Sequence, residues 1–123
     1  MKYILLTVIG LSLFASCKSA SNQITENKKT IRELVADDKT VLIDVRMQSE
    51  YEEGTAKGAL NIPVEDLEKN MSIFQNAENV VVFCNRGIKA DKAMDILKKN
   101  GIKNVYDGTS VKQIKALQAE NDK

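Results

Sequence analysis

Residues 80–90, VVVFCNRGIKA, carry the strongest structural signal in this chain. The β-branched and aromatic run from Val80 to Phe83 predicts a strand, and its continuous apolar character is typical of a strand buried on both faces of a parallel sheet. Cys84 follows that strand directly, and a helical pattern begins near Ala90. A strand joined to a helix by so short a loop predicts an α/β domain whose chemistry lies at the carboxyl end of the strand.

Strand and helix patterns alternate on both sides of this unit. Short apolar runs at residues 41–43, 59–62 and 104–106 predict three further strands. Capped or amphipathic segments predict helices that begin near Thr30, Ser49, Val64, Ala90 and Ser110. Gly54 and Gly101 are placed to end two of these helices. The alternation predicts one small α/β domain over residues 30–123, with a parallel sheet flanked by helices.

The composition excludes several kinds of site. The 123 residues include 18 Lys and Arg against 17 Asp and Glu, a balance that gives no electrostatic reason to expect nucleic acid as a partner. The chain has no His, which excludes Ser-His-Asp triads, Cys-His proteases and His-ligated zinc. Its two Cys are too few for a disulfide framework or a four-cysteine metal site. We therefore predict no metal and no cofactor.

The N-terminus has the pattern of an export signal. Lys2 precedes an apolar run that ends at Phe14, shorter than the about 20 residues that a membrane-spanning helix needs. Two small residues then lead into Cys17, which resembles the lipobox of bacterial lipoproteins, in which the Cys is lipidated and becomes the new N-terminus. We expect residues 1–16 to be a lipoprotein signal peptide. The alternative is an ordinary secretory signal that is cut near Ala20 and discards Cys17.

This signal predicts where the domain works. Residues 17–29 are almost wholly polar and are expected to form a tether between a lipid on Cys17 and the domain. The protein would then be exported and anchored to a bacterial membrane on the periplasmic side. Cys84 would be the only thiol in that oxidising compartment, without a partner for an internal disulfide.

The loop after Cys84 is suited to activating its sulfur. Backbone N–H groups that curl toward the sulfur, a helix N-terminus, and the cations Arg86 and Lys89 all favour a thiolate over a thiol. Gly87 permits a tight turn. We predict that Cys84 is the nucleophile, and that an anionic substrate is bound by the loop residues Asn85, Arg86, Gly87, Ile88 and Lys89. The alternative for Cys84 is a small apolar residue at a strand end.

An ordered set of motifs closely resembles the rhodanese-like (sulfurtransferase) domain over about residues 30–115. The matching pieces are Val41-Leu-Ile-Asp-Val-Arg46, Glu50-Tyr51, Gly54, Gly58-Ala59, Asn61-Ile-Pro63, residues 81–87, Ala93, residues 97–101 and Asn104-Val105. The resemblance implies a five-stranded parallel sheet between helices and Cys84 as the residue that carries sulfur as a persulfide. It also implies that Asp44 and Arg46 brace the reactive loop rather than touch substrate.

Three departures from the family pattern concern substrate choice and the last edge of the domain. Thr55-Ala56 replaces the usual His-Ile after Gly54. Thiosulfate-active loops commonly have Arg directly after the Cys and again five residues after it, where this chain has Asn85 and Lys89. Lys is a point charge rather than a planar fork, so the changes at Asn85 and Lys89 bear on the sulfur donor more than on persulfide chemistry, whereas Thr55 is not at the position of a partner for the nucleophile. The segment 107–110, DGTS, keeps one glycine of a usual Gly-Gly turn and lacks the Trp that follows.

The resulting hypothesis is a sulfurtransferase, expected to be monomeric, that takes sulfur from thiosulfate or a persulfide and gives it to a thiol or cyanide. One alternative is a rhodanese-like module that binds without catalysis. A second is a cysteine phosphatase or arsenate reductase, which resembles Cys followed by five residues and Arg, whereas Ala90 stands at that position here. A third is a thiol–disulfide oxidoreductase, which would need an outside resolving thiol because Cys-x-x-Cys is lacking.

Overall fold

A four-stranded parallel sheet forms the centre of the domain in this computed structural model, which describes residues 29–123. The strands lie side by side in the order β2-β1-β3-β4. Their bounds are β1 Thr40–Asp44, β2 Leu60–Asn61, β3 Asn79–Cys84 and β4 Val105–Ser110. The helices are α1 Ile31–Ala36, α2 Gln48–Glu53, the 3₁₀ helix η1 Val64–Asn70, α3 Met71–Gln75, α4 Ile88–Lys99 and α5 Val111–Asn121.

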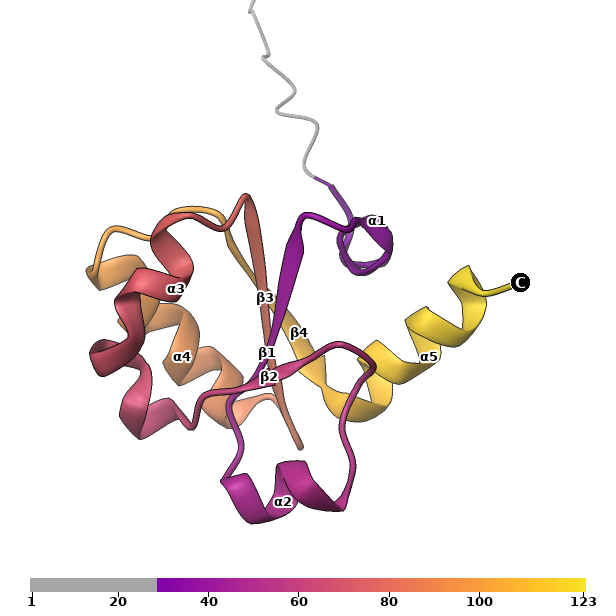
Figure 1. Cartoon of the computed structure of the whole chain (residues 1–123), viewed down its shortest axis with the longest axis horizontal. Helices are drawn as coiled ribbons and strands as arrows, with labels where there is room; N and C mark the ends of the chain where they lie inside the picture. The colour runs from indigo at the N-terminus through magenta and orange to yellow at the C-terminus, as the bar shows by residue number, and fades with distance from the viewer. Residues whose placement is uncertain (1–28) are drawn as a thin grey trace, which may run out of the picture.

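The helices cover both faces of the sheet (Figure 1). On one face, α4 and the η1–α3 segment pack over a core that contains Val80, Val82 and Leu97. On the other face, α1 and α5 enclose a smaller core around Phe83 and Ile114. The domain is therefore a three-layer α/β/α arrangement in which the sheet is buried on both sides.

Strand β3 is the central element, and all six of its residues are buried. Its side chains alternate between the two cores, so Val82 and Cys84 belong to the core under α4 while Phe83 belongs to the core under α5. Cys84 is 2% exposed. The strand that the apolar run predicted therefore places the sulfur at the carboxyl edge of the sheet, beneath the first turn of α4.

The positions of the strands were predicted more accurately from the sequence than the first residues of some helices. All four apolar runs are strands, and the α/β fold is confirmed. The expected fifth strand is not formed within residues 29–123; it came from the family resemblance alone, and no apolar run in the sequence indicated its place. Helix α2 begins before Ser49, because Glu50 accepts a hydrogen bond from the backbone N–H of Met47 and so caps the helix from there.

Strand β4 contains a bulge at the point where it passes the reactive region. Val82 pairs with Asp107 and Phe83 pairs with Thr109, which leaves Gly108 as an extra residue. A Cβ built on Gly108 would lie 2.7 Å from the side chain of Val81, so a larger residue would not fit against β3. The bulge lets β4 continue to Ser110, next to Cys84 in the register of the sheet.

The predicted signal peptide, its lipidated Cys17 and almost all of the tether lie outside the described residues. Across 29–123, none of the helices has the length and apolar character needed to cross a membrane.

Candidate active site

The sulfur of Cys84 lies in a cradle of backbone groups at the junction of β3 and α4. The N–H of Gly87 donates to Sγ at 3.0 Å, and the N–H of Ala90 donates to Sγ at 3.4 Å. The Cys84 thiol in turn donates to the carbonyl oxygen of Thr109, which is 3.7 Å away. Two N–H donors and the N-terminus of α4 stabilise negative charge on the sulfur. The cradle can therefore hold a thiolate or the anion of a persulfide.

The loop reaches this shape because Gly87 adopts a left-handed conformation with φ of 89°. Gly87 is also the N-cap of α4, so the same residue turns the chain and directs its N–H at the sulfur. A Cβ at this position would touch the side chain of Thr109 at 3.4 Å. The backbone conformation therefore favours glycine here, although a Cβ would fit.

One side of the cradle is held by a hydrogen-bonded network, which we call the braced side and which comprises Asp44, Arg46, Glu50, Thr55 and Asn85. The network is buried at Asp44 and Arg46 and reaches the surface at Asn85. Asp44 is fully buried and receives Nε of Arg46 at 3.0 Å and Nη2 at 2.7 Å. The hydroxyl of Thr55 also donates to Asp44, at 2.8 Å. The hydrogen bonds that Arg46 donates to Asp44 are the main cause of a raised pKa for Arg46. The charge pair is thus satisfied inside the protein.

Asn85 connects the braced side to the cysteine. Its side-chain oxygen accepts from Nη1 of Arg46 at 3.2 Å, and its amide nitrogen donates to Glu50 at 2.8 Å. Glu50 therefore joins the network through Asn85 rather than by pairing directly with Arg46. Both ends of the Asn85 side chain are engaged, although the sequence analysis assigned Asn85 to substrate binding. These contacts suit the predicted bracing role of Asp44 and Arg46, which stays a prediction.

The opposite side of the cradle, formed by the end of β4 and the start of α5, is built differently. We call Thr109, Lys112 and Lys115 the open side. Thr109 has φ of 69°, a left-handed conformation that is rare for a β-branched residue. Its N–H donates to the Asp107 carboxylate at 2.8 Å. Burial, followed by a hydrogen bond and repulsion from Asp91, raises the pKa of Asp107 above its usual value.

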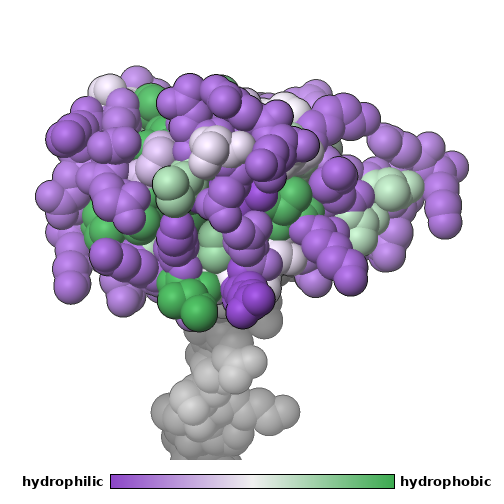
Figure 2. All heavy atoms as spheres, turned by 90° about the horizontal axis from the view of Figure 1, so that it is seen from below, coloured by the Kyte–Doolittle hydropathy of each residue, from purple (hydrophilic) through white to green (hydrophobic). Residues whose placement is uncertain are grey.

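The rim of the cradle exposes both charged and apolar side chains. Arg86 is exposed, Lys89 is partly buried, and neither forms an ion pair within the described part of the chain. Ile88 is 76% exposed and Met47 is 56% exposed. Seen from the side on which α2 lies, the surface is mostly hydrophilic, with separate hydrophobic side chains between the polar ones (Figure 2). The rim can attract an anion and still contact a carbon skeleton.

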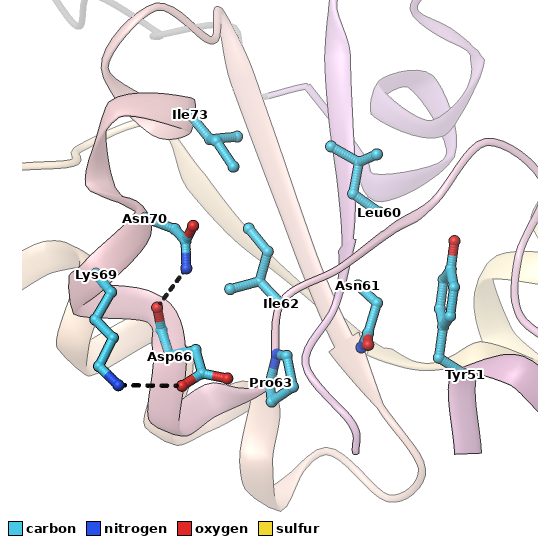
Figure 3. Close-up of a pocket in the computed structure, with 9 residues that line it drawn as sticks. All are labelled: Tyr51, Leu60, Asn61, Ile62, Pro63, Asp66, Lys69, Asn70 and Ile73. Atoms are coloured by element: carbon cyan, nitrogen blue, oxygen red, sulfur yellow. Dashed lines mark hydrogen bonds and ion pairs between the residues drawn. The ribbon is translucent and has the colours of Figure 1, made fainter. Parts of the chain in front are cut away.

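One pocket lies between the residue after Cys84 and the start of α5, and another lies along the edge strand β2. One, of about 400 Å³, is lined by Asn85, Val111, Lys112 and Lys115. The other, of about 370 Å³, lies along the edge strand β2, where Leu60 and Ile73 face a shared space while Lys69 pairs with Asp66 (Figure 3). No residue of the reactive loop lines the second pocket. The first pocket, in contrast, is lined by Asn85, which follows Cys84 directly in the sequence.

Thr109, Lys112 and Lys115 were not predicted from the sequence to lie near this site. The available signal was the departure at residues 107–110, where a threonine stands in place of the family's second glycine. In the described segment, no cluster of three or more Cys, Asp or Glu side chains is arranged to hold a metal ion.

Known proteins are similar to this chain in sequence and fold. A family model described as the rhodanese-like domain matches residues 27–108. A tRNA uridine(34) hydroxylase from Pelagibacter ubique is 32% identical over 102 residues, which are 80% of this chain and 34% of that protein. This chain thus spans about a third of the length of that relative.

Solved structures agree with the family model. A rhodanese with anions from E. coli has a TM-score of 0.56 and 29% identity, covering 60% of this chain and 89% of its own. A human single-domain sulfurtransferase has a TM-score of 0.53 and 28% identity, covering 62% of this chain and 80% of its own. With a cysteine cradled at the carboxyl end of the central strand and a family model that matches most of its length, this chain belongs to the rhodanese-like domain family.

Proposed function

We propose that this protein is a sulfurtransferase that carries sulfur as a persulfide on Cys84. The observation that supports the proposal most directly is the pair of backbone N–H groups, from Gly87 and Ala90, that donate to Sγ at 3.0 Å and 3.4 Å. Such a cradle stabilises the attacking thiolate and then the anionic persulfide without a histidine base, and the chain has no histidine.

The first half-reaction loads the sulfur. The Cys84 thiolate attacks the outer sulfur of thiosulfate, forming an S–S bond while the bond from that sulfur to the sulfonate group breaks. Sulfite leaves with the electron pair, and the persulfide anion stays on Cys84. An organic persulfide reacts in the same way and leaves as a thiolate. The cations Arg86 and Lys89 attract the anionic donor.

The second half-reaction empties the site. An acceptor thiolate, or cyanide, attacks the outer sulfur of the persulfide, and the S–S bond to Sγ breaks with its electron pair returning to Cys84. The products are an organic persulfide, or thiocyanate, and the original thiolate. The two half-reactions share one sulfur carrier, so ping-pong kinetics are expected.

The activities of other relatives fit this chain less well. The tRNA uridine(34) hydroxylase is a much longer protein, of which this chain spans 34%, and its name describes the whole of it. Phosphate chemistry favours bidentate Arg recognition of a tetrahedral anion, whereas this chain has Lys89 and then Ala90 where a cysteine phosphatase has its Arg six residues after the Cys. Sulfur transfer needs only the cradled sulfur and an anion-attracting rim.

Intact-mass measurement of the full chain carrying Cys17→Ser, in which Cys84 is the sole thiol, tests the proposal. Incubation with thiosulfate, or with an organic persulfide, should add one sulfur atom that cyanide then removes. The matched Cys84→Ser variant of that chain should gain nothing. A folded protein with a free thiol that gains no sulfur from either donor would contradict the proposal. In that case, aryl phosphate hydrolysis and partner binding would be examined next.

We also propose that Cys17 anchors this activity to a bacterial membrane. The support is the apolar run followed by Ala15, Ser16 and Cys17. A labelled fatty acid should be incorporated into the wild-type chain and not into the Cys17→Ser chain. Equal labelling of the two chains would contradict the anchor, and cleavage beyond Cys17 would favour an ordinary secretory signal.

A further inference from the structure

The pocket beside Asn85 has a composition that the cysteine cradle does not explain. Its volume of about 400 Å³ is in the range of small-molecule sites, whereas thiosulfate is a compact inorganic anion. Lys112 and Lys115 supply two cations, and Val111 supplies an apolar surface. The pocket is therefore suited to an organic anion rather than to an inorganic one.

The sheet places this pocket at the same edge as the reactive cysteine, although Cys84 itself is 2% exposed and does not line it. Cys84 pairs with Ser110 in the register between β3 and β4, and α5 begins at the next residue, Val111. Lys112 and Lys115 are three residues apart on this helix, so their side chains lie on one face. Asn85, the residue after Cys84, also lines this pocket.

The two lysines are also poorly explained by the stability of the fold. Lys112 lies in the first turn of α5, where the helix dipole disfavours a cation, and that turn contains no acidic residue. Both lysines are exposed, and among residues 29–123 neither has an ion-pair partner. On the braced side, by contrast, the cation Arg46 is paired with Asp44. Unpaired cations at the mouth of a pocket are free to meet a ligand.

We infer that Lys112 and Lys115 form a second anion subsite, which binds a carboxylate of an organic thiol or of its persulfide. The inference rests on the proposed sulfur transfer and narrows its organic substrate to a carboxylate-bearing one. With the carboxylate on the lysines and the carbon skeleton against Val111, the thiolate of the acceptor lies toward Cys84. It attacks the outer sulfur of the Cys84 persulfide, and the electron pair of the broken S–S bond returns to Sγ.

Transfer from the loaded enzyme to two acceptors tests this subsite. The acceptors are mercaptosuccinate, which carries carboxylates, and 2-mercaptoethanol, which carries none. The variant is Lys112→Gln with Lys115→Gln. Its kcat/KM for mercaptosuccinate should fall about fivefold, the size expected from two partly solvated charge pairs, while the value for 2-mercaptoethanol stays unchanged. Raising the ionic strength should shrink the difference.

A matched control is Lys98→Gln with Lys99→Gln, which removes the same charge from the last turn of α4. It should behave as the wild type with both acceptors. An equal fall for mercaptosuccinate in this control would assign the effect to net charge and overturn the subsite. An equal fall for both acceptors in the Lys112/Lys115 variant would also overturn it. Loss of a contact to a carboxylate cannot slow an acceptor that has no carboxylate.

A binding measurement separates failure of the subsite from failure of the proposed function. Succinate lacks a thiol, and it should shift the backbone amide NMR signals of residues 111–115 saturably in the wild type and not in the Lys112/Lys115 variant. If the wild type takes up no sulfur but binds succinate in this way, the proposed function fails and the anion subsite stands. If succinate leaves these signals unmoved, the subsite is overturned whatever Cys84 does.

Discussion

The two sides of the Cys84 cradle use opposite physical means. On the braced side, a fully buried carboxylate, a guanidinium and an amide form a closed set of hydrogen bonds that ends on the residue after Cys84. On the open side, Thr109 holds a left-handed backbone conformation against the sulfur, and two lysines have no ion pair within the described region. The first arrangement fixes the position of the loop that follows Cys84. The second leaves charged side chains available to bind a ligand.

The difference shows how a small domain can position one sulfur and still admit a substrate. A network with every polar group satisfied is rigid and has little capacity to bind anything else. An exposed edge with unpaired cations contributes little to stability, but it can bind an anion. Substitutions on the braced side should therefore mainly lower the free energy of unfolding and displace the loop. Substitutions on the open side should mainly change substrate binding.

Replacing Arg46 with Ala should have the largest effect on stability. The change leaves the Asp44 carboxylate buried without its partner and removes the contacts to Asn85 and to the carbonyl of Gly54. Loss of one partner of a buried ion pair costs about 3–5 kcal/mol. The free energy of unfolding, measured in urea, should fall by that amount.

The open side supplies the comparison for this measurement. The Lys112→Gln, Lys115→Gln variant should change the free energy of unfolding by less than about 0.5 kcal/mol, as is usual for exposed positions. If the Arg46 variant loses no more than the lysine variant, the braced side does not hold the loop, and the contrast between the two sides is wrong.

Thr109 provides a prediction of the opposite sign. Because a β-branched residue at φ of 69° is strained, Thr109→Gly should relieve the backbone. The strain removed exceeds the added flexibility of glycine in the unfolded chain, so the variant should be about 0.5–1 kcal/mol more stable. Urea unfolding of Thr109→Gly beside Thr109→Ala measures this, since Ala keeps the strain and should show no such gain. A less stable Gly variant would mean that the threonine side chain matters more than its backbone.

The sequence predicted the fold and one wall of the site for a shared physical reason. The central strands β1 and β3 leave continuous apolar runs that could be located from residues alone, and shorter runs marked β2 and the start of β4. The cradle is formed by neighbours in sequence, Cys84 to Ala90, and its turn is marked by Gly87. Apolar runs and glycine-marked turns are features of neighbouring residues, so the folded chain keeps the structure that they predict.

The open side could not be predicted because Thr109 meets Cys84, and the two lysines share a pocket with Asn85, only through tertiary pairing. Residues 107–110, DGTS, have the composition of a turn, yet they form the end of β4 because pairing with β3 outweighs their local preference. The short helix α3 was also missed, since no side chain caps its start. Where long-range contacts decide the conformation, the pattern of one segment is insufficient.

The smallest expected effect concerns Asp107, which accepts the N–H of Thr109 and lies beside Asp91. Burial and Asp91 raise the pKa of Asp107 above its usual 3.8, so the folded protein binds this proton more tightly than the unfolded chain does. The stability from this group is therefore complete below pH 3.8 and is lost as the pH rises through the folded pKa. Asp107→Asn keeps an oxygen for Thr109 and removes the charge. It should be more stable at pH 7 by no more than about 0.5 kcal/mol, because the group is partly exposed.

Urea unfolding at several pH values measures this effect, with Asp95→Asn, an exposed position on the same helix as Asp91, as the control. The wild type and the control should lose stability between pH 3.8 and the folded pKa of Asp107, and Asp107→Asn should not. If Asp107→Asn is instead less stable at pH 7, the negative charge is needed to hold the Thr109 N–H. The strained backbone would then be fixed by an anion, and the open side would depend on a satisfied charge as the braced side does.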